Sequence, residues 1–121
     1  MKTSAFTCGL DAALCVLGGK WKPLILFHLA HGTRRYGELR RAIGKVSDKV
    51  LIQQLKELQA DGIIARVDFG EMPPKVEYSL TAFGRTLGKA LAPLCEWGTK
   101  YSNDVEAIMA RRKAREHRHA A

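Results

Sequence analysis

Residues 36–62 read YGELRRAIGKVSDKVLIQQLKELQADG and contain two short helical patterns separated by a turn. Across Tyr36–Ile43 the apolar residues recur at helical spacing, and a glycine ends the pattern. Ser47 is a good N-cap for a second helix, which Gly62 ends. The buried stripe of that helix is formed by Leu51, Leu55 and Leu58. Two helices joined by so short a turn predict a helix-turn-helix at about residues 35–61.

Two further helical patterns precede this stretch. Leu10–Leu17 has apolar residues at helical spacing until two glycines interrupt it. Pro23 suits the first turn of the next helix, which Gly32 ends. The apolar face of that helix comprises Leu24, Ile25, Leu26 and Leu29. The sequence therefore predicts two helices before the helix-turn-helix.

After Gly62 the apolar period changes from that of a helix to that of a strand. Ile63–Phe69 and Val76–Leu80 are rich in β-branched and aromatic residues, and the segment between them, Gly70–Pro74, has the composition of a loop. This pattern predicts a β-hairpin, or wing, at about residues 63–80.

A long helix is expected beyond the wing, at about residues 82–108, with Thr81 as its cap. Its apolar residues alternate spacings of four and three, which is a heptad seam, and Pro93 should kink or divide it. Such a seam needs a partner. With the first helix it forms a predicted dimer interface of Leu10, Leu14, Leu87, Leu91, Leu94, Trp97, Tyr101, Val105 and Ile108. The alternative is packing within the chain, which would claim Phe83 and part of Leu87 and leaves Trp97 open to either use.

The expected architecture is mainly α with a small β-hairpin: a winged helix-turn-helix with N- and C-terminal dimerisation helices. At 121 residues the chain has room for one domain, residues 1–121. The basic tail, residues 109–121, is expected to be a frayed helix end that adds non-specific attraction to DNA.

The charge balance indicates a polyanionic partner. Lys and Arg number 20 against 12 Asp and Glu, a net charge of +8 with a sequence pI of about 9.7. After residue 110 there are five basic residues and one acidic residue, so +4 lies there and +4 remains in residues 1–110. No stretch has the ~20 apolar residues of a membrane span, and Met1–Thr7 is too short and polar for a secretory signal. We therefore expect a cytoplasmic protein without membrane contact.

Four segments of the chain, in the same order, resemble the HxlR family of winged-helix transcription regulators, relatives of the MarR group. They are Cys8 ten residues before Gly18-Gly19-Lys20-Trp21; Arg35-Tyr36-Gly37-Glu38-Leu39-Arg40-Arg41; Ser47-Asp48-Lys49-Val50-Leu51 with Gln54-Leu55-Lys56-Glu57-Leu58 and Asp61-Gly62; and Pro73-Pro74-Lys75-Val76-Glu77-Tyr78-Ser79-Leu80-Thr81 with Gly84 and Trp97-Gly98. The resemblance spans roughly residues 8–101 and implies a homodimer that binds double-stranded DNA.

A helix that reads DNA presents polar and basic side chains opposite its core stripe. On the helix that begins at Ser47, this face consists of Ser47, Asp48, Lys49, Ile52, Gln53 and Lys56. Gln53 suits adenine, Lys49 suits guanine or a phosphate, and Lys56 suits a phosphate. Ile52 departs from the small hydroxylated residue that the resemblance implies, although it could contact a thymine methyl group. The alternative is an ordinary solvated helix face.

Further cations surround this face and are expected to contact phosphates: Arg34, Arg35, Arg40 and Lys45, with Lys75 at the wing. If about five phosphates are neutralised, log affinity should fall with log salt at a slope of about −4.5. The wing tip offers only Glu71 and Lys75, so we expect a modest role there. The alternative is a loop that merely closes the hairpin.

Cys8 is the candidate regulatory residue. It lies near the start of the first helix, a position that raises the reactivity of a thiol. The resemblance implies that a cysteine here senses oxidants or electrophiles, whereas the alternative is an inert thiol. Cys15 and Cys95 fall on apolar helix faces and are expected to be small core residues. Three cysteines do not predict a structural disulfide framework.

Other functional classes receive less support. His28 with His31, and His117 with His119, lack further ligands at metal-binding spacing, and no phosphate-binding loop or activated nucleophile is evident. We therefore expect no enzyme activity, no cofactor and no metal site. The alternatives that stay open are an architectural nucleic-acid binder of weak specificity and a regulator with a ligand pocket at the dimer interface. A thiol oxidoreductase is disfavoured because Cys-x-x-Cys is absent. An effector, if present, would be an oxidant or a small molecule.

Overall fold

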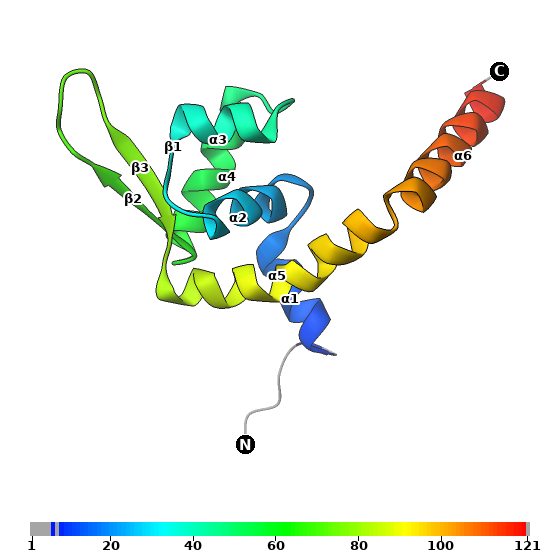
Figure 1. Cartoon of the computed structure of the whole chain (residues 1–121), viewed down its shortest axis with the longest axis horizontal. Helices are drawn as coiled ribbons and strands as arrows, with labels where there is room; N and C mark the ends of the chain where they lie inside the picture. The colour runs from blue at the N-terminus through cyan, green and yellow to red at the C-terminus, as the bar shows by residue number, and fades with distance from the viewer. Residues whose placement is uncertain (1–5, 7, 121) are drawn as a thin grey trace. The chain divides into compact units, whose positions relative to one another are not determined.

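The computed structural model describes residue 6 and residues 8–120. Its elements, in chain order, are α1 (Gly9–Leu17), α2 (Trp21–Ala30), β1 (Arg34–Arg35), α3 (Tyr36–Ile43), α4 (Asp48–Ala60), β2 (Ile64–Asp68), β3 (Val76–Leu80), α5 (Ala82–Lys100) and α6 (Ser102–Ala120) (Figure 1). The predicted fold class is confirmed: helices predominate, and the sheet is small. The expectation for Met1–Thr7 lies outside the described residues except at Phe6, and so does the last residue of the basic tail.

The chain forms two compact units, Met1–Lys89 and Ala90–Ala121. The first contains the elements from α1 to β3 and the start of α5, and the second contains the rest of α5 and α6. The assignment of residues 1–121 to a single domain stays a prediction.

The wing is a hairpin in an antiparallel sheet of order β1-β3-β2. In the hairpin, Ile64 pairs with Leu80 and Asp68 with Val76, and the backbone N–H of Phe69 donates to the carbonyl of Lys75 at 2.9 Å. Strand β1, which was not predicted from the sequence, pairs along β3 and places Arg34 opposite Tyr78. The hairpin was predictable from its alternation, whereas two residues are too short to show a period.

The core of the first unit lies between α2, α3, α4 and the base of the sheet. The predicted stripe of α4 is confirmed, because Leu51, Leu55 and Leu58 are at most 1% exposed. On α2, the buried residues include Ile25, Leu26 and Leu29, whereas Leu24 is half-buried. Burying such a stripe supplies most of the stability of a helix in a protein of this size.

An ion pair inside this unit was not expected from the sequence. Lys22 of α2 is buried, and its Nζ lies 2.6 Å from the Oε2 of Glu57 on α4. The hydrogen bond from Lys22 and its positive charge lower the pKa of Glu57. Since a buried ammonium group needs a partner, this contact helps to fix α4 against α2.

The start of α5 approaches the sheet closely. The hydroxyl of Thr81 donates to the carbonyl of Gly62 at 2.7 Å and accepts from the N–H of Gly84 at 2.9 Å, which confirms Thr81 as a cap. A Cβ at Gly84 would collide with the backbone carbonyl oxygen of Ile63. The alternative of packing within the chain is wrong for Phe83, which is 65% exposed. The glycine face of α5 turns toward the sheet, and the adjacent Phe83 therefore points elsewhere.

The later helices differ from the prediction in two respects. Pro93 does not divide α5, which continues to Lys100; a proline removes a single helical hydrogen bond, here to the carbonyl of Lys89. The division falls at Tyr101, just before Ser-Asn-Asp, three residues that favour helix starts. The basic tail is not frayed within the described residues, since α6 continues to Ala120. Its Ala, Arg, Lys and Glu residues are strong helix formers.

No single described helix is long and apolar enough to cross a membrane; α1 and α2, bent by 91°, meet the length and composition criteria only as a pair.

Within the described residues, no three His, Cys, Asp or Glu side chains cluster as metal ligands would. His31 is instead within 2.8 Å of the carbonyl of Phe27 through its Nδ1, and burial together with the charges of His31 and Arg34 lowers the pKa of His28.

Candidate nucleic-acid interface

The joint between α3 and α4 is built from polar side chains. The hydroxyl of Ser47 accepts from the N–H of Val50 at 3.2 Å, which confirms the predicted N-cap of α4. At the next position, Asp48 accepts a hydrogen bond from the hydroxyl of Tyr36 and forms an ion pair with Arg40, whose Nε lies 2.8 Å from its carboxylate oxygen. Burial and the contact with Asp48 raise the pKa of Tyr36 to about 12. Three residues of the joint thus hold α3 and α4 at a fixed angle.

This arrangement changes the expected roles of two candidate DNA contacts. Arg40 and Asp48 were both assigned to DNA from the sequence, and the structure joins them to each other. Charge pairing between them offsets the positive charge that Arg40 would offer to a phosphate. Asp48 serves the joint, and a contact with DNA remains a prediction for both residues.

The exposed face of α4 has the composition that base reading requires. Lys49, Ile52, Gln53 and Lys56 are all exposed, on the side away from the buried leucine stripe. The amide nitrogen of Gln53 lies 3.5 Å from a carboxylate oxygen of Glu57, a long contact that leaves its carbonyl group unengaged. The helix therefore presents an amide, two ammonium groups and one branched aliphatic side chain on a single surface.

The surrounding cations differ in how far they are engaged within the chain. Arg34 is half-buried and donates from Nη1 to the carbonyl of Thr33 at 3.1 Å. Arg35 and Lys45 are exposed, and no ion pair forms to either from the described part of the chain. In the wing, the ammonium group of Lys75 lies 4.4 Å from the ring centre of Phe69 and 3.8 Å from Glu77. Lys75 therefore contributes to the hairpin itself.

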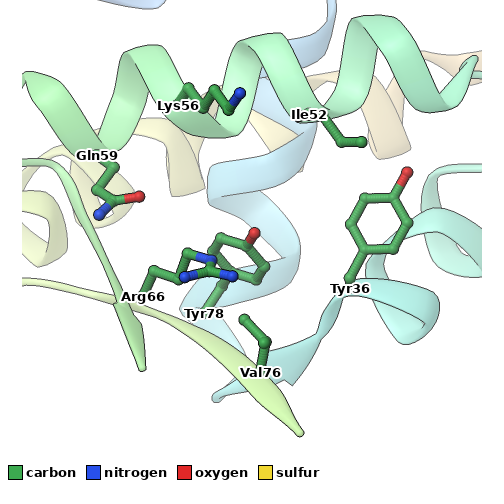
Figure 2. Close-up of a pocket in the computed structure, with 7 residues that line it drawn as sticks. All are labelled: Tyr36, Ile52, Lys56, Gln59, Arg66, Val76 and Tyr78. Atoms are coloured by element: carbon green, nitrogen blue, oxygen red, sulfur yellow. The ribbon is translucent and has the colours of Figure 1, made fainter. Parts of the chain in front are cut away.

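A hollow of about 430 Å³ separates the exposed face of α4 from the sheet (Figure 2). Ile52 and Lys56 line it from α4, Val76 and Tyr78 line it from β3, and Arg66 lines it from β2. Arg66 faces it because its cross-strand partner is Tyr78, two positions along the sheet from the buried pair Ile64 and Leu80. Arg66 was not among the cations predicted from the sequence to contact DNA. Because residues two apart in a strand share a face, Arg66 could have been placed on the same face as Ile64 from the sequence.

The three cysteines are all exposed. Cys8 is the N-cap residue of α1, and its side chain makes no capping hydrogen bond. The expectation that Cys15 and Cys95 are core residues is wrong, because both are exposed. The helix faces that carry these two cysteines are apolar in sequence, but the two thiols are not buried in the core.

The predicted dimer residues lie on two apolar faces. On α1, Leu10 is 67% exposed and Leu14 57%. On the α5 and α6 seam, Leu94 is 64% exposed and Trp97 53%, and Tyr101 is also exposed. The remaining seam residues are half-buried, namely Leu87, Leu91, Val105 and Ile108. The chain alone thus leaves large apolar side chains in solvent on both faces.

A helix-turn-helix followed by a hairpin wing, with a polar and basic exposed face on its second helix, defines a winged helix-turn-helix protein. A family model described as HxlR-like helix-turn-helix matches residues 16–106. The chain therefore belongs to the HxlR-like helix-turn-helix family and is a transcriptional regulator, not an enzyme. The match confirms the resemblance of most of the segments identified in the sequence, although Cys8 lies before it.

Individual proteins agree with this assignment. The chain is 43% identical over 107 residues to the HTH-type transcriptional regulator YdeP of Bacillus subtilis (strain 168), covering 88% of this chain and 84% of that protein. It is similar to the redox regulator HypR in its oxidised form (TM-score 0.72, 44% identity, 77% of this chain and 96% of that chain). A transcriptional regulator of the MarR family from Porphyromonas gingivalis has a TM-score of 0.69 and 37% identity over 84% of this chain and 96% of its own.

Proposed function

We propose that this regulator binds double-stranded DNA as a homodimer and reads sequence through the exposed face of α4. The observation that carries the proposal is the composition of that face: Lys49, Gln53 and Lys56 project from a helix whose opposite side is buried. Such side chains match the donors and acceptors of the major groove. The joint between Tyr36, Arg40 and Asp48 supports the proposal, because reading bases requires a helix held in a fixed orientation.

The homodimer is supported by the exposed apolar faces of α1 and of the α5 and α6 seam, which a second copy would cover. A two-fold dimer presents two copies of α4 and therefore reads two half-sites about 34 Å apart. Cations that flank α4, among them Arg35, Lys45 and Arg66, would contact phosphates.

Selection of bound sequences from random duplex DNA tests the proposal. The expected result is an enriched, pseudo-palindromic site that binds ~1,000-fold or more tightly than unrelated DNA at physiological salt. Binding without any enriched sequence would instead support an architectural role. Enrichment of a single half-site would contradict the dimeric arrangement.

We further propose that Cys8 makes DNA binding sensitive to oxidants. The support is its exposed thiol at the start of α1 and the similarity of the chain to a protein described as a redox regulator. In a dimer, two Cys8 thiols would form one disulfide while diamide is reduced to the hydrazine. DNA affinity of the unmodified protein should change at least severalfold on treatment with diamide. The variants Cys15→Ser and Cys95→Ser serve as controls. If DNA binding by Cys8→Ser responds to diamide as the unmodified protein does, the sensor is not Cys8.

A further inference from the structure

The second half of α6 forms a cationic surface that takes no part in the base reading proposed for α4. It contains Arg111, Arg112, Lys113, Arg115 and Arg118 with two histidines, against the single acidic residue Glu116. These side chains are exposed, and no ion pair forms to any of them from the described part of the chain. The helix is continuous from Ser102 to Ala120, so the cations have fixed positions along it.

The cations are gathered on one side of the helix. At 100° per residue, four arginines (Arg111, Arg112, Arg115 and Arg118) and His119 fall within an arc of about 120°. Lys113 falls on the other side. Arg112, Arg115, Glu116 and His119 line one shallow depression of the surface. A single-sided arrangement of this kind suits an extended anion that lies along the helix.

The cationic side continues the register of the apolar seam. The seam positions of α6 are Val105 and Ile108, and the same spacings of four and three lead next to Arg112, Arg115 and His119. Across a two-fold axis, these positions would bring like charges together. Where the two copies of this segment face each other, repulsion between like charges disfavours contact beyond about Ile108, which leaves the face beyond it for another partner.

The helix dipole does not account for these charges. Basic residues stabilise a helix C-terminus, but the effect falls off within the last turn. Arg111 and Arg112 lie more than two turns before the end of α6 at Ala120. Solubility does not account for them either, because an ordinary solvated face carries interspersed charges of both signs.

We propose that this face, Arg111 to His119 of α6, is a second DNA-binding surface, which contacts the phosphate backbone of duplex DNA without reading bases. The inference rests on the proposed function for its partner, DNA. Arginine suits a phosphate because its guanidinium donates two parallel hydrogen bonds. Phosphate contacts add affinity but carry no sequence information.

The test compares cations on the two sides of α6. The triple variant Arg111→Gln, Arg115→Gln and Arg118→Gln should make the slope of log affinity against log salt shallower by up to about 2.7, because about 0.9 is lost for each phosphate contact. The single variants Arg115→Gln and Lys113→Gln remove the same charge from opposite sides, and only the first should weaken binding to a duplex. Circular dichroism should show unchanged helix content in all variants.

Several outcomes would overturn the inference. Equal losses for Arg115→Gln and Lys113→Gln would mean that net charge alone matters. A tenfold or greater change in the dimer dissociation constant of the triple variant, measured by analytical ultracentrifugation, would place the cations in the seam. Loss of binding to phosphatidylglycerol vesicles with duplex affinity intact would identify a lipid surface as the partner.

The proposed function and this inference fail separately. If the unmodified protein enriches no DNA sequence but the triple variant still loses duplex affinity and salt dependence, sequence reading by α4 fails and the second surface stands. If a selected site is bound with the same affinity and slope by the triple variant, the second surface fails and the reading by α4 stands. An unchanged sequence preference with weaker overall affinity supports both.

Discussion

Helix α4 and the α5 and α6 seam are both amphipathic, but their apolar faces differ in how far they are buried. On α4 the leucine stripe is at most 1% exposed, whereas on the seam Leu94 and Trp97 are more than half exposed. The chain by itself buries the apolar face of α4 but leaves large side chains of the seam exposed. Amphipathic periodicity therefore predicts a buried face but not whether that face is covered by the same chain.

The largest expected effect is a core truncation on α4. Leu55→Ala removes a buried side chain from a packed core and should lower the free energy of unfolding by about 2–5 kcal/mol. Leu94→Ala removes an exposed side chain, and any loss of stability should depend on protein concentration, because it acts through dimerisation. Urea denaturation at two protein concentrations measures both. Equal, concentration-independent losses would show that the seam is packed within the chain.

The next effect concerns assembly. Leu94→Asp places a charge in the seam and should raise the dimer dissociation constant at least about 100-fold, because an unpaired charge would be buried at the interface. Met72→Asp at the exposed wing tip is the matched control and should leave it unchanged. Sedimentation at micromolar concentration distinguishes the two. A monomeric unmodified protein would show that the seam is not a dimer interface.

A smaller effect is expected at the ion pair between α2 and α4. Lys22 lowers the pKa of Glu57, so the ionised carboxylate stabilises the fold above its ordinary pKa of 4.5, and this contribution is lost as the pH falls through the lowered value. Glu57→Gln leaves Lys22 buried without a charged partner and should destabilise the protein, although less than Leu55→Ala does. Unfolding midpoints of both proteins across this pH range should converge as the pH falls. Parallel curves would mean that the ionisation of Glu57 makes no contribution to stability.

The smallest effect concerns single phosphate contacts beside α4. Arg35→Gln should weaken DNA binding severalfold and make the salt slope shallower by about 0.9, because one counterion fewer is released. Lys89→Gln, on an exposed part of α5, removes the same charge and serves as the control. Fluorescence anisotropy at four salt concentrations gives both slopes. Identical slopes for the two variants would remove Arg35 from the interface.

Local patterns predicted much of the fold. The limits of α3, the Ser47 cap, the α4 stripe and the hairpin all follow from the spacing of nearby residues. The helical order of residues 109–120 could also have been predicted from their composition. Periodicity cannot show which exposed polar groups meet: the pairs Arg40 with Asp48 and Lys22 with Glu57 depend on how the helices cross. Arg66 was missed although the alternation of β2 places it on the same face as Ile64. The exposure of Phe83 depends on the close approach of Gly84 to the sheet, which periodicity does not show.

Base reading by α4 is tested by the base preference of Gln53→Ala on a selected site. If the exposed face of α4 reads DNA, this variant should lose about 5- to 100-fold affinity at sites that carry adenine at one position of each half-site, and little at sites that carry another base there. Its affinity for unrelated DNA should be unchanged. Equal weakening on every sequence, or no weakening on any, would contradict the assignment of base reading to α4.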